Sequence, residues 1–157
     1  PMLSKVESSD PNEVVFYGHC KGVTHPNPAV ICHPWADAMY ETVYSNWQQA
    51  KAMLESFAMA GSFKKYGTFK SPFNHRWHYS GTFYWFRSAS VFVRNWQHVD
   101  QLFYGTESWP GTLFRPDECG CLFHDNTGDL YKESNSALSQ KLTEWRHIAL
   151  SNQLITN

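Results

Sequence analysis

The segment 77–88, W-H-Y-S-G-T-F-Y-W-F-R-S, constrains the fold most, because it predicts a strand that is covered on both faces. From Gly81 to Arg87 the side chains alternate with a period of two, and most of them are aromatic or β-branched, which is typical of a β-strand. Both alternating sets are bulky, so we expect other elements on each side of the strand. Ser80 and Gly81 predict a tight turn at its start, where a glycine lets another strand or a ligand approach the backbone closely. A core strand with a glycine bend explains the segment as well as a ligand site does.

A helical pattern precedes this strand. Between residues 35 and 60, apolar side chains recur at spacings of three and four, which predicts a long helix packed against the sheet. The stripe consists of Trp35, Met39, Val43, Trp47, Ala50, Leu54 and Phe57. Pro34 suits a first helical turn, and Gly61 suits the position after the last one. We interpret the stripe as core packing and assign it no chemistry.

Shorter segments complete an α/β pattern with a mixed sheet. Strands are expected at 13–20, 63–69 and 118–125, and helices at 89–101 and 136–150. The 157 residues contain no repeat and no linker, so we expect a single domain over 1–157. The polar residues 1–12 are expected to be poorly ordered, and they look like the interior of a longer gene.

The composition excludes some classes of protein. The net charge of −1 does not indicate electrostatic binding to nucleic acid. No apolar run reaches the ~18 residues of a membrane span, and no signal peptide opens the chain. Four cysteines without a disulfide or zinc-finger pattern indicate reduced thiols and a cytoplasmic location, with attachment to the inner membrane as an alternative. Aromatic residues reach 17% and charged residues only 17%, which predicts a ligand cleft lined by rings or a covered partner surface.

Two places offer candidate functional residues. His19 and Lys21 follow the first expected strand, at the carboxyl end where α/β proteins commonly bind ligands. Glu107 is the single acid between Asp100 and Asp117, and it lies among aromatic residues and glycines. A carboxylate against aromatic walls has its charged form disfavoured, which suits a general base. An ordinary polar strand end and an ordinary surface acid are the alternatives.

The order of these motifs resembles that of GT-A-type glycosyltransferases of bacterial surface-polysaccharide synthesis. Residues 17–23, Y-G-H-C-K-G-V, are similar to the family pattern Y-x-H-T-K-G-V. Residues 78–85, H-Y-S-G-T-F-Y-W, are similar to H-F-S-G-N-F-W-W, and residues 104–109 follow as Y-G-T-E-S-W. The resemblance covers roughly residues 14–124.

The resemblance implies transfer of a sugar from a nucleotide-sugar donor to a saccharide acceptor. It makes Glu107 the candidate catalytic base. It places the donor near His19, Lys21 and Gly22, with Lys21 facing phosphate. It places the acceptor near a larger set of residues, namely His78, Ser80, Gly81, Trp85, Arg87 and Trp109.

The chain departs from the family in two ways. It has no D-x-D motif, the usual holder of a divalent cation and diphosphate, so the cofactor is left unassigned and residues 19–22 are the candidate replacement. Relatives also carry a nucleotide-binding portion before the Y-x-H-T-K-G strand. We therefore expect a partial GT-A domain that works with a missing N-terminal half or as an oligomer, and little transferase activity from these residues alone.

Two other functions are kept as alternatives. A non-catalytic carbohydrate-binding or interaction module could retain the aromatic residues without using Glu107 as a catalytic base. A zinc module could use Cys119, Cys121 and His124, although no fourth ligand stands at a diagnostic spacing.

Overall fold

The computed structural model describes residues 2–19, 28–67, 77–101, 105–125, 128 and 134–155. Its strands are β1 (Val14–Tyr17), β2 (Met59–Ser62), β3 (Lys64–Tyr66), β4 (Trp77–Tyr79), β5 (Tyr84–Arg87) and β6 (Cys119–Phe123). Its α-helices are α1 (Pro28–Met39), α2 (Trp47–Met53), α3 (Ser88–Val91), α4 (Gly105–Leu113) and α5 (Asn135–Ile155). The 3-10 helices are η1 (Met2–Lys5) and η3 (Pro116–Glu118), and η2 (Tyr40–Ser45) is a π-helix. In this part of the chain, no helix is long and apolar enough to cross a bilayer.

Four strands form a mixed sheet in the order β1-β5-β2-β6. β5 is antiparallel to both β1 and β2, whereas β6 is parallel to β2. β3 and β4 form a second, antiparallel sheet. The single residue Phe63 separates β2 from β3, and residues 80–83 separate β4 from β5. The chain therefore passes from one sheet to the other at two sharp corners.

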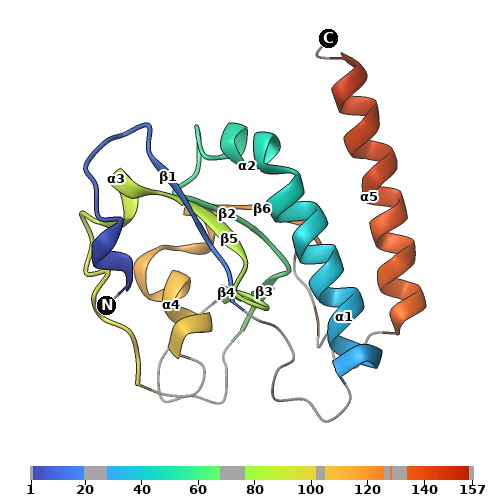
Figure 1. The fold of residues 1–157 in the computed structure, drawn as a ribbon, viewed down its shortest axis with the longest axis horizontal. Coiled ribbons are helices and arrows are strands. Elements are labelled where there is room, and N and C mark those ends of the chain that lie inside the picture. The colour runs from blue at the N-terminus through green and yellow to red at the C-terminus, as the bar shows by residue number, and fades with distance from the viewer. Residues whose placement is uncertain are drawn as a thin grey trace.

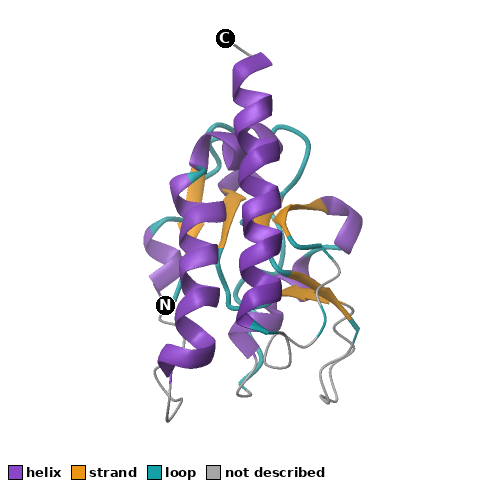
Figure 2. Ribbon diagram, turned by 90° about the vertical axis from the view of Figure 1, so that its right-hand side faces the viewer, coloured by secondary structure: helices purple, strands orange, loops and turns teal. Residues whose placement is uncertain are grey.

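The four-stranded sheet lies between two apolar layers (Figures 1 and 2). On one face, α1, η2, α2 and α5 cover a core to which Phe83 and Trp85 contribute. On the other face, Tyr84 and Phe86 pack with residues of β4 and α4. The second core is formed largely by aromatic side chains: Trp77, Tyr79, Tyr84, Phe86, Trp96, Trp109 and Phe114. The alternation in 81–87 thus reflects burial on both faces of β5.

The mixed α/β fold expected from the sequence is confirmed, but the long helix has other bounds. The helical run begins at Pro28 and ends at Met53, with a π-helical segment and a break at Asn46. Residues 59 and 60, expected in the helix, lie in β2. A Cβ at Gly61 would lie 2.9 Å from the carbonyl oxygen of Phe83. β2 is paired with strands on both sides, and this pairing overrides the helix that was expected to extend to residue 60.

Three other expected elements differ in extent. The strand expected from Gly81 begins at Tyr84, because Gly81 and Thr82 have φ values of +96° and +57° and form the turn. The helix expected at 89–101 is reduced to α3, whereas the glycine-rich segment 103–111 contributes most of α4. The strands expected at 13–20 and 63–69 are observed as β1 and β3, with residues 20, 68 and 69 outside the described part.

The N-terminal segment is placed against the second core. Met2–Lys5 form η1, and Leu3 packs against the apolar cluster on the α4 side. The Ser88 N–H donates to the carbonyl of Glu13 (3.0 Å), which connects this segment to the start of α3.

Candidate functional site

Three strands end at one edge of the larger sheet. Because β1 and β2 are both antiparallel to β5, and β6 is parallel to β2, the carboxyl ends of β1, β2 and β6 lie beside the start of β5. This carboxyl edge is the lower edge of the sheet in Figure 1. Ligands of open α/β sheets commonly bind outside such an edge.

The backbone at the carboxyl edge is unusual. Among the described residues, three non-glycine residues have positive φ: Phe63 at 57°, Thr82 at 57° and His124 at 56°. Phe63 follows β2, Thr82 lies before β5, and His124 follows β6. The Phe63 N–H donates to the carbonyl of Phe123 (2.8 Å), so two of these corners are hydrogen-bonded neighbours. Backbone in sparsely populated conformations concentrates at functional sites, which makes this edge the primary candidate.

The turn at Gly81 is held from two sides. On the helical side it packs so closely under α1 that a Cβ at Gly81 would lie 2.5 Å from the Met39 sulfur and 3.4 Å from Trp35 Nε1. On the other side its N–H donates to Glu107 Oε1 (3.0 Å). The conformation and the lack of space both require glycine at this position.

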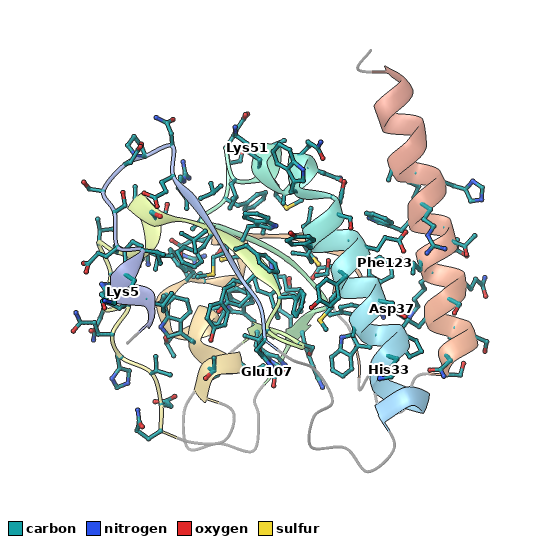
Figure 3. All side chains as sticks on the ribbon, viewed as in Figure 1. Lys5, His33, Asp37, Lys51, Glu107 and Phe123 are labelled. Atoms are coloured by element: carbon teal, nitrogen blue, oxygen red, sulfur yellow. The ribbon has the colours of Figure 1, made fainter. Side chains whose placement is uncertain are left out.

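Glu107 lies in the first turn of α4 and is half-buried. It lies at the carboxyl edge, below β3 and β4 in Figure 3. Within the described part of the chain, the Gly81 N–H is its hydrogen-bond partner. The second carboxylate oxygen therefore has no protein donor there, and it can accept a proton or a hydrogen bond from a bound hydroxyl group.

His78 and Ser80 form a buried pair beside the turn. They are 3% and 4% exposed, and Ser80 Oγ lies 3.1 Å from His78 Nε2, within hydrogen-bonding distance. The Ser80 N–H donates to the carbonyl of Phe63 (2.9 Å), which fixes the two corners relative to each other. In this conformation the pair is buried and supports the turn.

The remaining residues expected at the acceptor side lie elsewhere. The indole N–H of Trp85 donates to the carbonyl of Val43 (3.0 Å), in the layer of helices. Arg87 lies at the other end of β5 and contacts the carbonyl of Phe57. Trp109 is 2% exposed and donates to the carbonyl of Trp96 (2.9 Å). These three side chains are not brought together with Glu107.

On the donor side, the structure describes only His19. Tyr17 pairs with Tyr84, so the exposed His19 follows β1 at the carboxyl edge, on the side of the Gly81 turn. Lys21 and Gly22 lie outside the described residues.

The cysteines form no metal site within the described residues, where no group of three or more His, Cys, Asp and Glu side chains lies together. Burial raises the pKa of Cys119 to about 12 and that of Cys121 to about 11. Both thiols are therefore harder to deprotonate than an ordinary cysteine, and zinc binds the thiolate. His124, the third residue of the zinc alternative, lies 3.0 Å from Lys141 Nζ.

A pocket of about 480 Å³ beside β6 was not expected from the sequence. Its polar lining includes Lys64, Tyr66, Cys121 and Asp125. Burial, and then the nearby Asp125 carboxylate, raise the pKa of Tyr66 to about 12. No sequence motif pointed to this pocket, because its walls come from three separate segments of the chain, 53–57, 64–66 and 116–125.

The carboxyl edge thus places a half-buried carboxylate against a rigid turn, with a histidine at the end of a neighbouring strand. Such an arrangement can bind a hydroxyl group and accept its proton. Comparison of the chain with models of protein families, with curated proteins and with solved structures found no match.

Proposed function

We propose that this chain is the acceptor-binding part of a GT-A-type glycosyltransferase, with Glu107 as the general base. One observation carries the proposal. The Gly81 N–H and Glu107 Oε1 are 3.0 Å apart although they are 26 positions apart in the sequence. This contact joins the S-G turn and the acid, two of the motifs on which the resemblance to these enzymes depends.

In the proposed reaction, Glu107 takes the proton of an acceptor hydroxyl group. The hydroxyl oxygen forms a bond to the anomeric carbon of the donor sugar, and the bond from that carbon to the diphosphate oxygen breaks. The nucleoside diphosphate leaves with the bonding electron pair. The hydrogen bond from the Gly81 N–H fixes Oε1 of Glu107. Because the turn is rigid, this bond also holds the second carboxylate oxygen, which takes the proton, in one orientation. General-base catalysis of this kind contributes about 10²–10⁴-fold to a rate.

The donor is proposed to lie on the β1 side of the carboxyl edge. His19 supports this placement, because it follows β1 next to the start of β5. The departing nucleoside diphosphate also needs a positive charge or a metal ion to stabilise it. Lys21 is the candidate from the sequence, and we assign no metal ligands, because the described residues contain no cluster of suitable side chains.

A carbohydrate-binding module without catalysis is the second candidate, and exposed aromatic rings favour it. Tyr40 and Tyr44 are each 53% exposed, and the Tyr40 ring lies 5.0 Å from that of Phe83, which follows the Gly81 turn. Aromatic faces of this kind can stack on the C–H faces of sugars. This module would bind a saccharide near the turn without transferring it.

The two candidates are separated by measuring turnover and binding in the product of the parent gene. UDP-glucose, UDP-galactose and GDP-mannose serve as donors with a panel of oligosaccharide acceptors, and release of UDP or GDP is recorded. If the protein is an enzyme, UDP or GDP is released and Glu107→Gln abolishes this release, whereas calorimetry still detects binding of the acceptor. If it is a binding module, the unsubstituted protein and Glu107→Gln bind the acceptor equally and neither releases UDP or GDP. This outcome would refute the proposal.

A further inference from the structure

The pocket beside β6 contains a buried positive charge. Lys64 lines it and is 4% exposed. Two of the three N–H groups of its ammonium donate to the carbonyls of Cys119 (2.7 Å) and Pro116 (2.5 Å). The rings of Tyr66 and Trp77 lie 5.5 and 5.4 Å from Nζ, and a ring face attracts a cation without carrying a net charge. Among the described residues, the ammonium is therefore held by neutral groups.

This charge has no negative partner in the described part of the chain. None of the ion pairs there includes Lys64, and the third N–H of its ammonium has no acceptor. A charge that is removed from water without a counter-charge is costly. A carboxylate that enters the pocket would accept the third N–H and neutralise the charge. The surroundings of Lys64 therefore suit an anionic group of a ligand.

The pocket carries the opposite charge at its mouth. Asp117 and Asp125 line it and are exposed, whereas Lys64 is buried, so the positive charge lies at the inner end. The Arg115 guanidinium donates two hydrogen bonds to Asp117 (3.1 and 2.8 Å), which compensates that carboxylate. Asp125 accepts a hydrogen bond from the Tyr66 hydroxyl, and a carboxylate can accept several. Asp125 is therefore the group at the mouth that can bind a cation.

The two charges are neighbours across one ring. The Tyr66 ring has the Lys64 ammonium 5.5 Å from its centroid, and its hydroxyl is hydrogen-bonded to Asp125. Both charges also reach the Cys121 thiol: burial raises its pKa to about 11, Asp125 raises it and Lys64 lowers it. One small molecule can therefore contact both charges.

An apolar wall lies beside these charges. Met53 and Phe57 line the pocket and are half-buried. A Cβ at Gly120 would lie 2.2 Å from the Met53 sulfur and 3.1 Å from the Phe57 ring, so glycine allows both side chains to pack directly on β6. The pocket volume of about 480 Å³ lies within the range of about 300–1,000 Å³ that is common for small-molecule sites. The wall suits a hydrocarbon chain.

We propose that this pocket binds a small zwitterion, an amino acid with a hydrocarbon chain. Its carboxylate contacts Lys64 at the inner end, its ammonium contacts Asp125 at the mouth, and its chain packs on Met53 and Phe57. Phosphates and nucleotides do not suit the pocket, because they carry more negative charge than one ammonium neutralises and the carboxylates at the mouth repel them.

An NMR titration of the chain tests the class of ligand. L-leucine and 6-aminohexanoate are the probes, because they hold the two charges at different separations. Each is compared with its analogue without the ammonium (4-methylpentanoate and hexanoate) and with its analogue without the carboxylate (3-methylbutylamine and hexylamine). We expect at least one zwitterion to shift the amide signals of Lys64 and Cys121 and to bind about tenfold or more tightly than its analogues. Failure of both zwitterions to bind, or equal binding of the analogues, would overturn the proposal.

Substitutions assign the two charges. Asp125→Asn changes an exposed residue, and it should weaken binding of the zwitterion about tenfold without weakening that of the analogue that lacks the ammonium. Asp117→Asn is the matched control and should change the affinity by about twofold or less, because Arg115 already compensates Asp117. Zwitterion binding that Asp125→Asn leaves unchanged would contradict the proposal.

Lys64→Met tests the inner end, where it should abolish the advantage of a carboxylate. Denaturant unfolding shows whether this variant folds. If it does not fold, the amine analogues, which lack the carboxylate, test the inner end in the unsubstituted chain. None of these results depends on the proposed sugar transfer.

Discussion

Replacing Gly81 by alanine tests whether the turn at the carboxyl edge is as tightly enclosed as the structure indicates. The φ of +96° costs a residue with a side chain about 1–2 kcal/mol. The new Cβ would also lie 2.5 Å from the sulfur of Met39, which is fully buried. Overpacking of a buried site costs about 1–3 kcal/mol. We therefore expect Gly81→Ala to lower the free energy of unfolding by about 2–5 kcal/mol.

The chain contains a matched control for the backbone term. Gly67 has a φ of +100°, and a Cβ there would meet nothing within 4 Å. Gly67→Ala should therefore lose only the conformational part, about 1–2 kcal/mol. Denaturant unfolding followed by tryptophan fluorescence measures both variants, and thermal unfolding should show a fall in Tm of about 2–4 °C for each kcal/mol.

A double mutant identifies the source of the difference. In a Met39→Ala background, Gly81→Ala should cost no more than Gly67→Ala does, because the side chain that the new Cβ meets has been removed. If Gly81→Ala is no more destabilising than Gly67→Ala in the native background, α1 does not pack closely on the turn. The turn is then not rigid either.

Three further predictions concern the surroundings of the sheet. The raised pKa of Cys121, about 11 instead of 9.0, means that stability present below pH 9 is lost as the pH rises from about 9 to 11. The loss is about 3 kcal/mol at 1.36 kcal/mol per pKa unit, and Cys121→Ala should remove that part of the pH dependence in urea unfolding. Lys64→Met should lower the free energy of unfolding by about 3 kcal/mol, because the buried carbonyl of Cys119 and the part-buried carbonyl of Pro116 lose a charged donor; an effect below 1 kcal/mol would show that Lys64 does not hold β6. Glu41→Gln should cost only about 0.5 kcal/mol, and less at high salt, because Arg146 and Glu41 pair at the surface; a larger loss that salt does not change would contradict this.

The sequence predicted the fold best where local pattern and tertiary environment agree. The alternation after Gly81 predicted a strand buried on both faces, and Tyr84 and Trp85 do pack into opposite cores. It failed at β2, because the helix was expected to extend to residue 60, whereas Met59 and Ala60 lie in a strand whose Gly61 must fit against Phe83 and its neighbours. That requirement comes from strands distant in the sequence and leaves no local signal.

The helix α4 shows the same limit. Gly105, Pro110 and Gly111 have low helix propensity and no helix was expected there, yet the segment is helical. Packing of Trp109 into the second core compensates for the propensity. As a result, Glu107 could be selected from the sequence as an isolated acid, but its contact with Gly81 could not, because the contact depends on how this unexpected helix meets the sheet.

The rate of sugar transfer by Glu107→Gln in the product of the parent gene tests the proposed role of Glu107 as the general base. Glutamine keeps an oxygen that can accept the Gly81 N–H but cannot take a proton, so the turn is preserved and the chemistry is not. Glu107→Ala serves as the comparison, because it removes both functions. A general-base role predicts that Glu107→Gln unfolds with nearly the native free energy and transfers sugar at least about 100-fold more slowly than the unsubstituted enzyme. Transfer at the native rate by Glu107→Gln, with destabilisation only in Glu107→Ala, would show that this residue anchors the turn and does no chemistry.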